Sequence, residues 1–149
     1  MILQNWNRRT IAIMIFSVKK LVQFSNCDPF GIVFYPQYFY ICSEAKEDFF
    51  IHVGHPHYHY INVLKLGWPM ARLETDFFAP TRFGERIDVQ IGLTKIGTSS
   101  LGIRYTILGE DGSKRMSAGT TVVLTSLESK RPTPMPGDLK FALEPYLIN

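Results

Sequence analysis

A single carboxylate, Asp28, lies in an otherwise apolar and aromatic stretch of the chain, just before an expected helix start. The stretch reads SNCDPFGIVFYPQYFYICSEAKEDFF over residues 25–50, and its pattern becomes helical after Pro36. The first turn of a helix has unpaired N–H groups at the positive end of the helix dipole. A carboxylate that folds back to this point could attack a carbonyl carbon or activate water while the N–H groups bind the oxyanion.

The residues next to Asp28 fit the backbone that such a site requires. Gly31 gives the turn conformational freedom, and Pro36 suits the first helical turn, where an N–H has no partner to lose. The simpler interpretation of Asp28 is a turn residue, since Asp-Pro often opens a turn. Only the wider motif can decide between the two interpretations.

The motif DPFGIVFYPQY over residues 28–38 resembles the signature of hot-dog-fold acyl-CoA thioesterases of the 4-hydroxybenzoyl-CoA thioesterase type. Agreement of several residues between a first strand and a long helix makes the motif fairly specific. The resemblance implies that Asp28 is the catalytic carboxylate, as nucleophile or as base for water. It also implies that the backbone N–H of Tyr35 is the oxyanion donor.

Further residues are expected to bind the substrate. Ser43 occupies the helix position where the hydroxybenzoyl-type enzymes carry an acidic residue, which argues against a 4-hydroxyl group on the substrate. Those enzymes have a basic cluster that binds the nucleotide phosphates, and the matching stretch of this chain is the turn 95–100. The N–H groups, hydroxyls and lysine of this turn could bind phosphate. An ordinary hairpin turn is an equally good interpretation. The complete expected set is Gly31, Phe34, Ser43, Tyr58, Trp68, Lys95, Gly97, Thr98 and Ser99.

The aromatic members of the expected pocket indicate the kind of acyl group. Phe30, Phe34, Tyr58 and Trp68 favour an aryl or otherwise bulky group. For Trp68, at the start of an expected strand, a place in the core is an equally good interpretation.

Two glutamates on the expected helix, Glu44 and Glu47, offer an alternative carboxylate, because a different hot-dog branch uses a helix glutamate. Charged residues on a helix usually remain exposed to solvent. The loop motif therefore favours Asp28.

Four histidines follow near the end of the expected helix: His52, His55, His57 and His59. Histidines at i, i+2 and i+4 on a strand would share a face and could bind zinc. A proline and two tyrosines among them instead favour a mobile aromatic loop over residues 55–60, bordering the acyl pocket or a subunit contact. We expect neither a metal site nor a cofactor.

The spacing of apolar residues predicts one long helix and five strands. The helix begins at Pro36 and ends near Val53-Gly54, and its charged residues Glu44, Lys46, Glu47 and Asp48 are placed on faces away from the core. The strands are expected within 12–25, at 68–78, 87–93, 101–107 and 116–124, with a hairpin turn at 109–113. Asp138 is expected to cap a short final helix through Leu143, and residues 1–10 to form a loose extension.

These elements predict an α+β hot-dog fold, with one long helix wrapped by a five-stranded antiparallel sheet. We expect a single domain over 1–149, with a core of about 12–128 and a Pro-rich tail and short helix over 129–149. Open sheet edges invite pairing. The family resemblance implies a homodimer or homotetramer, a dimer of dimers, with active sites at the protomer boundary.

Composition limits the partners and the compartment. The 149 residues are 46% hydrophobic and 19% charged, with a formal charge of +3, which is typical of a soluble globular protein. Basic residues are scattered, which disfavours nucleic acid, and Cys27 and Cys42 form no disulfide or metal pattern. The apolar run at 11–16 is short for a signal sequence, and nothing is long enough to span a membrane. We therefore expect a cytoplasmic protein without membrane contact.

The expected activity is hydrolysis of an acyl-CoA to a carboxylic acid and free coenzyme A. One alternative is hydrolysis of thioesters of acyl carrier protein, whose acidic surface would favour a basic rim such as Lys19, Lys20, Arg82 and Lys95. Another is a non-catalytic acyl-CoA-binding protein, which would have no need of a carboxylate at Asp28.

Overall fold

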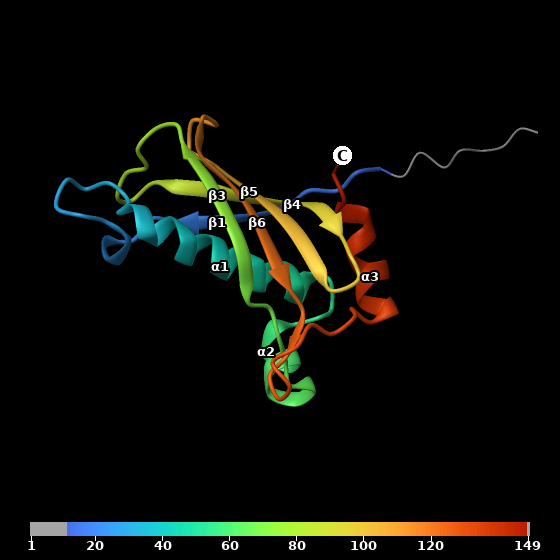
Figure 1. The fold of residues 1–149 in the computed structure, drawn as a ribbon. Coiled ribbons are helices and arrows are strands. Elements are labelled where there is room, and N and C mark those ends of the chain that lie inside the picture. Colours follow the sequence, from blue (N-terminus) through green and yellow to red (C-terminus); the bar gives the residue numbers. More distant parts are fainter. Residues whose placement is uncertain (1–11, 149) are drawn as a thin grey trace, which may run out of the picture.

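A long helix packed against a five-stranded antiparallel sheet dominates the structure (Figure 1). The computed structural model describes residues 12–148. Helix α1 covers Tyr35–His52, and the strand order in the sheet is β1-β4-β5-β6-β3. The strands are β1 (Phe16–Leu21), β3 (Met70–Phe77), β4 (Arg86–Ile96), β5 (Ser100–Leu108) and β6 (Lys114–Val123). The predicted hot-dog arrangement is confirmed.

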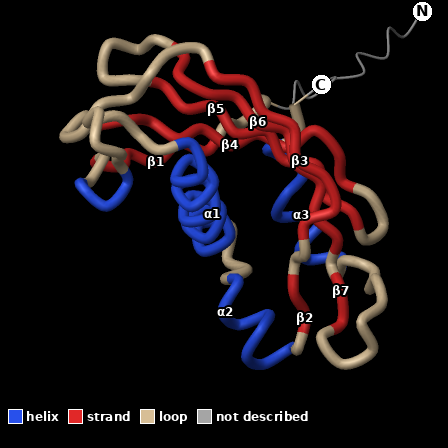
Figure 2. Tube along the Cα trace, turned by 60° about the vertical axis from the view of Figure 1, so that its left-hand side comes forward, coloured by secondary structure: helices blue, strands red, loops and turns tan. Residues whose placement is uncertain are grey.

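The sheet curves around α1, as the tube view shows (Figure 2). Alternate residues of the central strands point toward the helix, as the period of two predicts. Among them Val89, Ile91 and Ile103 are completely buried, and so are Ala45 and Phe49 on the facing stripe of α1. The helix therefore covers the concave face of the sheet. This packing sets the position of the amino end of α1.

Smaller elements extend this core. Strand β2 (Leu66–Gly67) pairs with β7 (Thr125–Ser126), and the remaining elements are η1 (Phe24–Asn26), α2 (His57–His59), the π-helical turn η2 (Tyr60–Leu64), α3 (Gly137–Leu143) and η3 (Glu144–Tyr146). None of the helices within residues 12–148 is long and apolar enough to cross a membrane.

Several local predictions need correction. Residues 55–60 are largely helical rather than a loop, because they form α2 and the start of η2. Helix α3 has Pro136 at its N-cap, so Asp138 lies in the first turn instead of capping it. The first strand, Phe16–Leu21, lies within the predicted range 12–25, so that prediction is confirmed, and the expected extension at 1–10 lies outside the described residues.

The end of α1 follows the prediction closely. Gly54 adopts φ +83°, a left-handed conformation that glycine takes without strain. Its N–H donates to the Ile51 carbonyl at 3.0 Å, and the His55 N–H donates to the Phe50 carbonyl at 2.9 Å. These bonds satisfy carbonyl groups that the helix end would otherwise leave unpaired.

Candidate active site

Asp28 opens a tight turn that reverses the chain just before α1. Its carbonyl accepts the Gly31 N–H at 3.0 Å, and its own N–H donates to Ile32 at 3.0 Å. Asp, Pro and Gly occupy the first, second and fourth positions, the composition typical of a type I turn. Gly31 adopts φ +74°, which a side chain would strain. The turn interpretation of Asp28 is therefore correct, and it leaves the chemical interpretation open.

The carboxylate of Asp28 uses one oxygen for the turn and leaves the other free. Oδ1 accepts the Phe30 N–H at 2.9 Å, and within residues 12–148 Oδ2 has no hydrogen-bond partner. The side chain is half-buried and lines a hollow of about 470 Å³ together with Phe24, Cys27, Pro29, Gly31 and Phe83. A carboxylate oxygen without a partner beside apolar groups is available to a substrate.

The amino end of α1 supplies a free backbone donor. The Gln37 N–H donates back to the Phe34 carbonyl at 2.8 Å, and Pro36 has no N–H. The Phe34 N–H donates to the Asn26 carbonyl at 2.9 Å, which ties the helix start to the base of the hairpin that carries Asp28. Among the described residues this leaves the Tyr35 N–H as the unpaired donor of the first turn. The carboxylate and the donor thus belong to one hydrogen-bonded unit.

A neighbouring loop, residues 79–85, holds this unit against the sheet. Thr81 is completely buried, accepts the Val33 N–H through its carbonyl at 2.8 Å, and accepts the Tyr38 hydroxyl at its Oγ1 at 3.0 Å. The Phe83 N–H donates to the Gly31 carbonyl at 2.9 Å. A threonine in a loop has no distinguishing sequence pattern, so the role of Thr81 could not be predicted from the sequence.

An ion pair fixes the same loop from behind. The Arg115 guanidinium lies 2.7 Å from the Glu85 carboxylate and donates to the Pro80 carbonyl at 2.7 Å. Burial alone would raise the pKa of Glu85, but hydrogen bonds from the Arg82 and Glu110 backbone and from Arg115 lower it below its ordinary value. Glu85 therefore stays ionised. Its carboxylate accepts the Glu110 N–H, which attaches the 79–85 loop to the turn formed by Gly109–Ser113.

The two cysteines are poor candidates for the nucleophile. Burial and the negative charge of Asp28 both raise the pKa of Cys27, and burial raises that of Cys42 to about 12. Only a thiolate is an effective nucleophile. Both are free thiols that stay protonated at neutral pH, which leaves Asp28 as the candidate.

A second, smaller cavity of about 170 Å³ lies between α1 and the strands β3 and β6. Phe39, Cys42, Ser43 and Lys46 line it from the helix at i, i+3, i+4 and i+7 spacing, which places them on one face. Lys46 is only 8% exposed, so its predicted place on a solvent-facing side of the helix is wrong. The remaining lining residues are Met70, Leu73, Tyr105, Ala118 and Thr120.

Within one copy of the protein, the two cavities lie apart from each other. Ser43 comes eight residues after Tyr35, which corresponds to about 12 Å along the helix axis. The 95–99 turn is farther away: the start of β4 pairs with Leu21 on the Asp28 side, and ten residues of strand, about 33 Å, lead to Ile96. A single chain therefore does not bring Ser43 or the turn of Lys95, Gly97, Thr98 and Ser99 to Asp28.

Trp68 and Tyr58 lie apart from Asp28 as well, whereas Gly31 and Phe34 belong to the turn and the helix start beside it. Trp68 is 6% exposed and stacks on Phe50 with ring centroids 5.6 Å apart, so it belongs to the core of the single chain. Tyr58 is exposed on α2, and Phe34 is half-exposed at the start of α1. Their contact with substrate stays a prediction.

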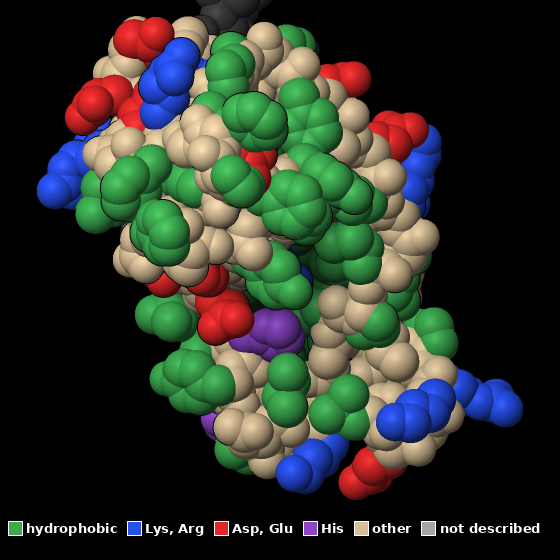
Figure 3. Space-filling model, turned by 90° about the vertical axis from the view of Figure 1, so that its left-hand side faces the viewer, with side chains coloured by type: hydrophobic (Ala, Val, Ile, Leu, Met, Phe, Trp, Pro, Cys, Tyr) green, Lys and Arg blue, Asp and Glu red, His purple; other side chains and the backbone are tan. Residues whose placement is uncertain are grey.

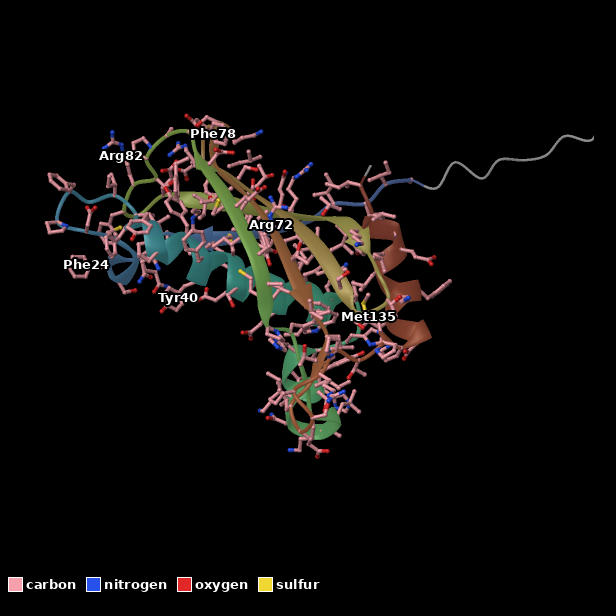
Figure 4. The ribbon with its side chains drawn as sticks, viewed as in Figure 1. Phe24, Tyr40, Arg72, Phe78, Arg82 and Met135 are labelled. Atoms are coloured by element: carbon pink, nitrogen blue, oxygen red, sulfur yellow. The ribbon has the colours of Figure 1, made fainter. Side chains whose placement is uncertain are left out.

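Hydrophobic side chains are exposed over the end of the molecule where α1 begins. Phe24 and Phe30 are 81% and 86% exposed, and Phe83 packs edge-on against Phe24. Figure 3 shows hydrophobic groups spread across this face with charged groups mainly at its margin. Figure 4 places Phe24, Phe78 and Arg82 at this end and Met135 at the opposite one. Such a large apolar surface is typical of an interaction site.

The histidines do not converge on one point. His52 Nε2 is 3.0 Å from the Tyr146 hydroxyl, and His55 Nδ1 is 2.9 Å from the Tyr60 hydroxyl. Over residues 12–148 no three His, Cys, Asp or Glu side chains are grouped to hold a metal ion. The alternative carboxylates Glu44 and Glu47 are exposed on α1, where Glu44 lies 4.0 Å from Lys20.

Comparison with known proteins places this geometry in context. A family model described as the thioesterase-like superfamily matches residues 22–143. The chain is 27% identical to a 1,4-dihydroxy-2-naphthoyl-CoA hydrolase of Thermosynechococcus vestitus over 130 residues, covering 85% of this chain and 89% of the relative.

Solved structures share the architecture. A 1,4-dihydroxy-2-naphthoyl-CoA thioesterase from Synechocystis superposes with a TM-score of 0.80 at 24% identity, covering 87% of this chain and 96% of the other. A protein from Thermus thermophilus gives a TM-score of 0.80 at 26% identity, covering 91% and 100%. The similarity extends over nearly the whole fold rather than the motif alone.

Proposed function

The chain belongs to the thioesterase-like superfamily, and from this we propose that it is an acyl-CoA thioesterase that uses Asp28 and the Tyr35 N–H. One observation carries the proposal: within residues 12–148 neither Asp28 Oδ2 nor the Tyr35 N–H has a hydrogen-bond partner, and the bond from the Phe34 N–H to the Asn26 carbonyl joins the segments that carry them. Family membership supplies the thioester as the group on which this pair acts.

The reaction follows from these two groups. The Asp28 carboxylate attacks the thioester carbonyl carbon, or takes a proton from a water that attacks it. The carbonyl oxygen becomes negative and accepts the Tyr35 N–H at the positive end of α1. Collapse of this intermediate breaks the carbon–sulfur bond and releases coenzyme A thiolate. On the nucleophilic route, water then hydrolyses the acyl-aspartyl anhydride and restores the carboxylate.

Two copies of the chain would complete the site through strand β3. This strand pairs with β6 on one side, and among the described residues nothing pairs with its other edge. Leu73 and Phe77, on the α1 side of the strand, are 41% and 48% exposed. An open edge of eight residues with exposed apolar side chains is a ready surface for self-pairing.

Antiparallel self-pairing of β3 has a specific consequence for the cavities. Phe77 contacts Tyr38 near the start of α1, whereas Met70 lines the smaller cavity with Ser43. A two-fold axis through the middle of β3 would set the Met70 end of one copy beside the Phe77 end of the other. The smaller cavity of one copy then faces the Asp28 end of its partner, which removes the separation found along one chain.

We assign the acyl group to this smaller cavity and expect it to be aromatic. A volume of about 170 Å³ with mainly apolar walls is sufficient for an aromatic ring, since an engineered apolar cavity of about 150 Å³ binds benzene. The relative from Thermosynechococcus vestitus is named for a dihydroxynaphthoyl thioester, which supports an aryl group.

The acyl carrier protein alternative has less support from the surface charges. Lys19 pairs with Asp88 at 3.0 Å and Lys20 pairs with Asp48 at 2.8 Å, which reduces their attraction for an acidic partner. Arg82 and Lys95 lie near opposite ends of β4, so the four residues do not form one rim. Coenzyme A is therefore the favoured carrier.

Thiol release tests the proposal directly. Naphthoyl-, benzoyl-, butyryl- and palmitoyl-CoA would be compared with the same acyl groups on acyl carrier protein, using a thiol reagent for free coenzyme A. We expect the aryl-CoA thioesters to give the highest kcat/KM. Tight acyl-CoA binding without thiol release would instead indicate a binding protein, and faster turnover on carrier-protein thioesters would favour the alternative carrier.

A further inference from the structure

Lys46 lines the cavity assigned to the acyl group. Only 8% of the residue is exposed, and no carboxylate of the described residues forms an ion pair with it. We propose that Lys46 determines acyl specificity by binding an oxygen on the ring of an aromatic acyl group, a hydroxyl or its oxyanion that is not adjacent to the thioester. The inference rests on the proposed thioesterase function.

The surroundings of Lys46 leave its charge incompletely compensated. The charged or titratable groups that act on it are Glu47, the next residue on α1, and His57, on the packed helix α2. Burial lowers the pKa of Lys46, and the negative charge of Glu47 only partly opposes this. Within residues 12–148 the Lys46 Nζ has no hydrogen-bond partner, and it is not fully buried, so it stays accessible to solvent or to a ligand. A bound oxygen atom with negative charge would compensate the charge of the ammonium.

The cavity walls indicate what else the ligand carries. Ser43 and Lys46, one helical turn apart, place a hydroxyl and an ammonium on the same face, while Phe39, Met70 and Leu73 provide apolar contacts. A ring can pack on these apolar side chains while a single oxygen meets the ammonium. A phosphate does not fit this description, since a doubly charged group would need several donors.

This assignment changes the expectation drawn from Ser43. Replacement of an acidic residue by Ser43 argued against a ring hydroxyl, because the carboxylate that would accept its proton is absent. Lys46 lies one turn farther along α1 and is a donor, so it recognises the same oxygen as an acceptor or anion. The sequence did not predict that Lys46 lines the cavity, because a lysine flanked by acidic residues such as Glu44 and Glu47 normally indicates a solvated helix face.

A matched pair of substrates tests the role of Lys46. In 1,4-dihydroxy-2-naphthoyl-CoA the ring carries a C4 hydroxyl, meta to the thioester carbon, that 1-hydroxy-2-naphthoyl-CoA lacks. The wild-type protein is expected to favour the first by about tenfold to a hundredfold in kcat/KM, the range of a hydrogen bond to a charged group. Lys46→Met keeps the side-chain length without the charge, and the ratio is expected to fall to about one, mainly through KM.

Lys19→Met removes an exposed lysine on β1, at the opposite edge of the sheet from β3, and should keep the wild-type ratio. If Lys46→Met lowers both substrates by the same factor, Lys46 has only a structural role and the inference is wrong. A wild-type protein that hydrolyses both thioesters without preference refutes the inference and leaves the thioesterase intact. A wild-type protein that hydrolyses no acyl-CoA refutes the proposed function itself.

Discussion

Asp28→Asn is expected to lower kcat on an aryl acyl-CoA by about a hundredfold to ten-thousandfold, the range for removal of a general base or nucleophile. The amide oxygen of asparagine can still accept the Phe30 N–H that Asp28 Oδ1 accepts now. The turn should therefore survive while the free carboxylate oxygen is lost. Initial rates of thiol release measure the first effect, and thermal unfolding checks the second.

Asp88→Asn is the matched control for this variant. Asp88 is an aspartate on β4 whose ion pair with Lys19 is largely exposed, and such pairs contribute about 0–1 kcal/mol to stability. Both variants should unfold near the wild-type Tm, and Asp88→Asn should keep the wild-type kcat. Wild-type turnover in folded Asp28→Asn would exclude Asp28 from the chemistry and direct attention to Glu44 or Glu47.

Tyr35→Pro should lower kcat by about a hundredfold to a thousandfold, the usual effect of removing one oxyanion donor. The substitution deletes the N–H at the first position of α1, where proline is well tolerated in a helix. Phe34 already has φ −68° and ψ 128°, the extended conformation that a residue before proline prefers. Because the donor acts on the transition state, kcat should fall while KM changes little. Steady-state rates on one aryl acyl-CoA separate the two constants.

Tyr35→Ala separates the backbone donor from the side chain. The Tyr35 ring is 61% exposed and lies edge-on to the neighbouring Phe34 ring, so its loss should leave the helix start in place. We expect Tyr35→Ala to retain most of the wild-type kcat. Equal losses in the alanine and proline variants would mean that the ring matters and that the N–H does not bind the oxyanion.

The sequence was sufficient for the parts of the fold that repeat a simple period. Alternation at Ile87, Val89 and Ile91 predicted a strand, and the stripe from Tyr38 to Phe49 predicted the buried face of α1. Gly54 ended the helix where a left-handed residue was needed. Each of these predictions depends on local geometry that the residue types themselves constrain.

The spatial relations within the site depend on contacts far apart in the chain, and the sequence could not supply them. Lys46 is buried because β3 and β6 lie over its helix face, and these strands come much later in the chain. The turn carrying Lys95 lies far from Asp28 because β4 runs the full length of the sheet. Residues 57–59 are helical although their histidine spacing also suited a strand, since periodicity cannot distinguish such short segments.

The central claim is that Asp28 and the Tyr35 N–H of one copy act on a thioester whose acyl group lies in the partner's cavity. Ser43 is an exposed residue of α1 at the cavity, and Ser43→Trp should fill the cavity with the indole ring. Dimers made only of this variant, or only of Asp28→Asn, should be inactive. Equal amounts of the two variants, each with its own affinity tag, are mixed, unfolded and refolded. Hybrid dimers, with one copy of each variant, are then isolated by the two tags in turn. In the unfractionated mixture we predict about a quarter of wild-type thiol release, since half of the two-fold dimers are hybrids with one intact site of two. Purified hybrids that fold and associate but release no thiol would contradict the account.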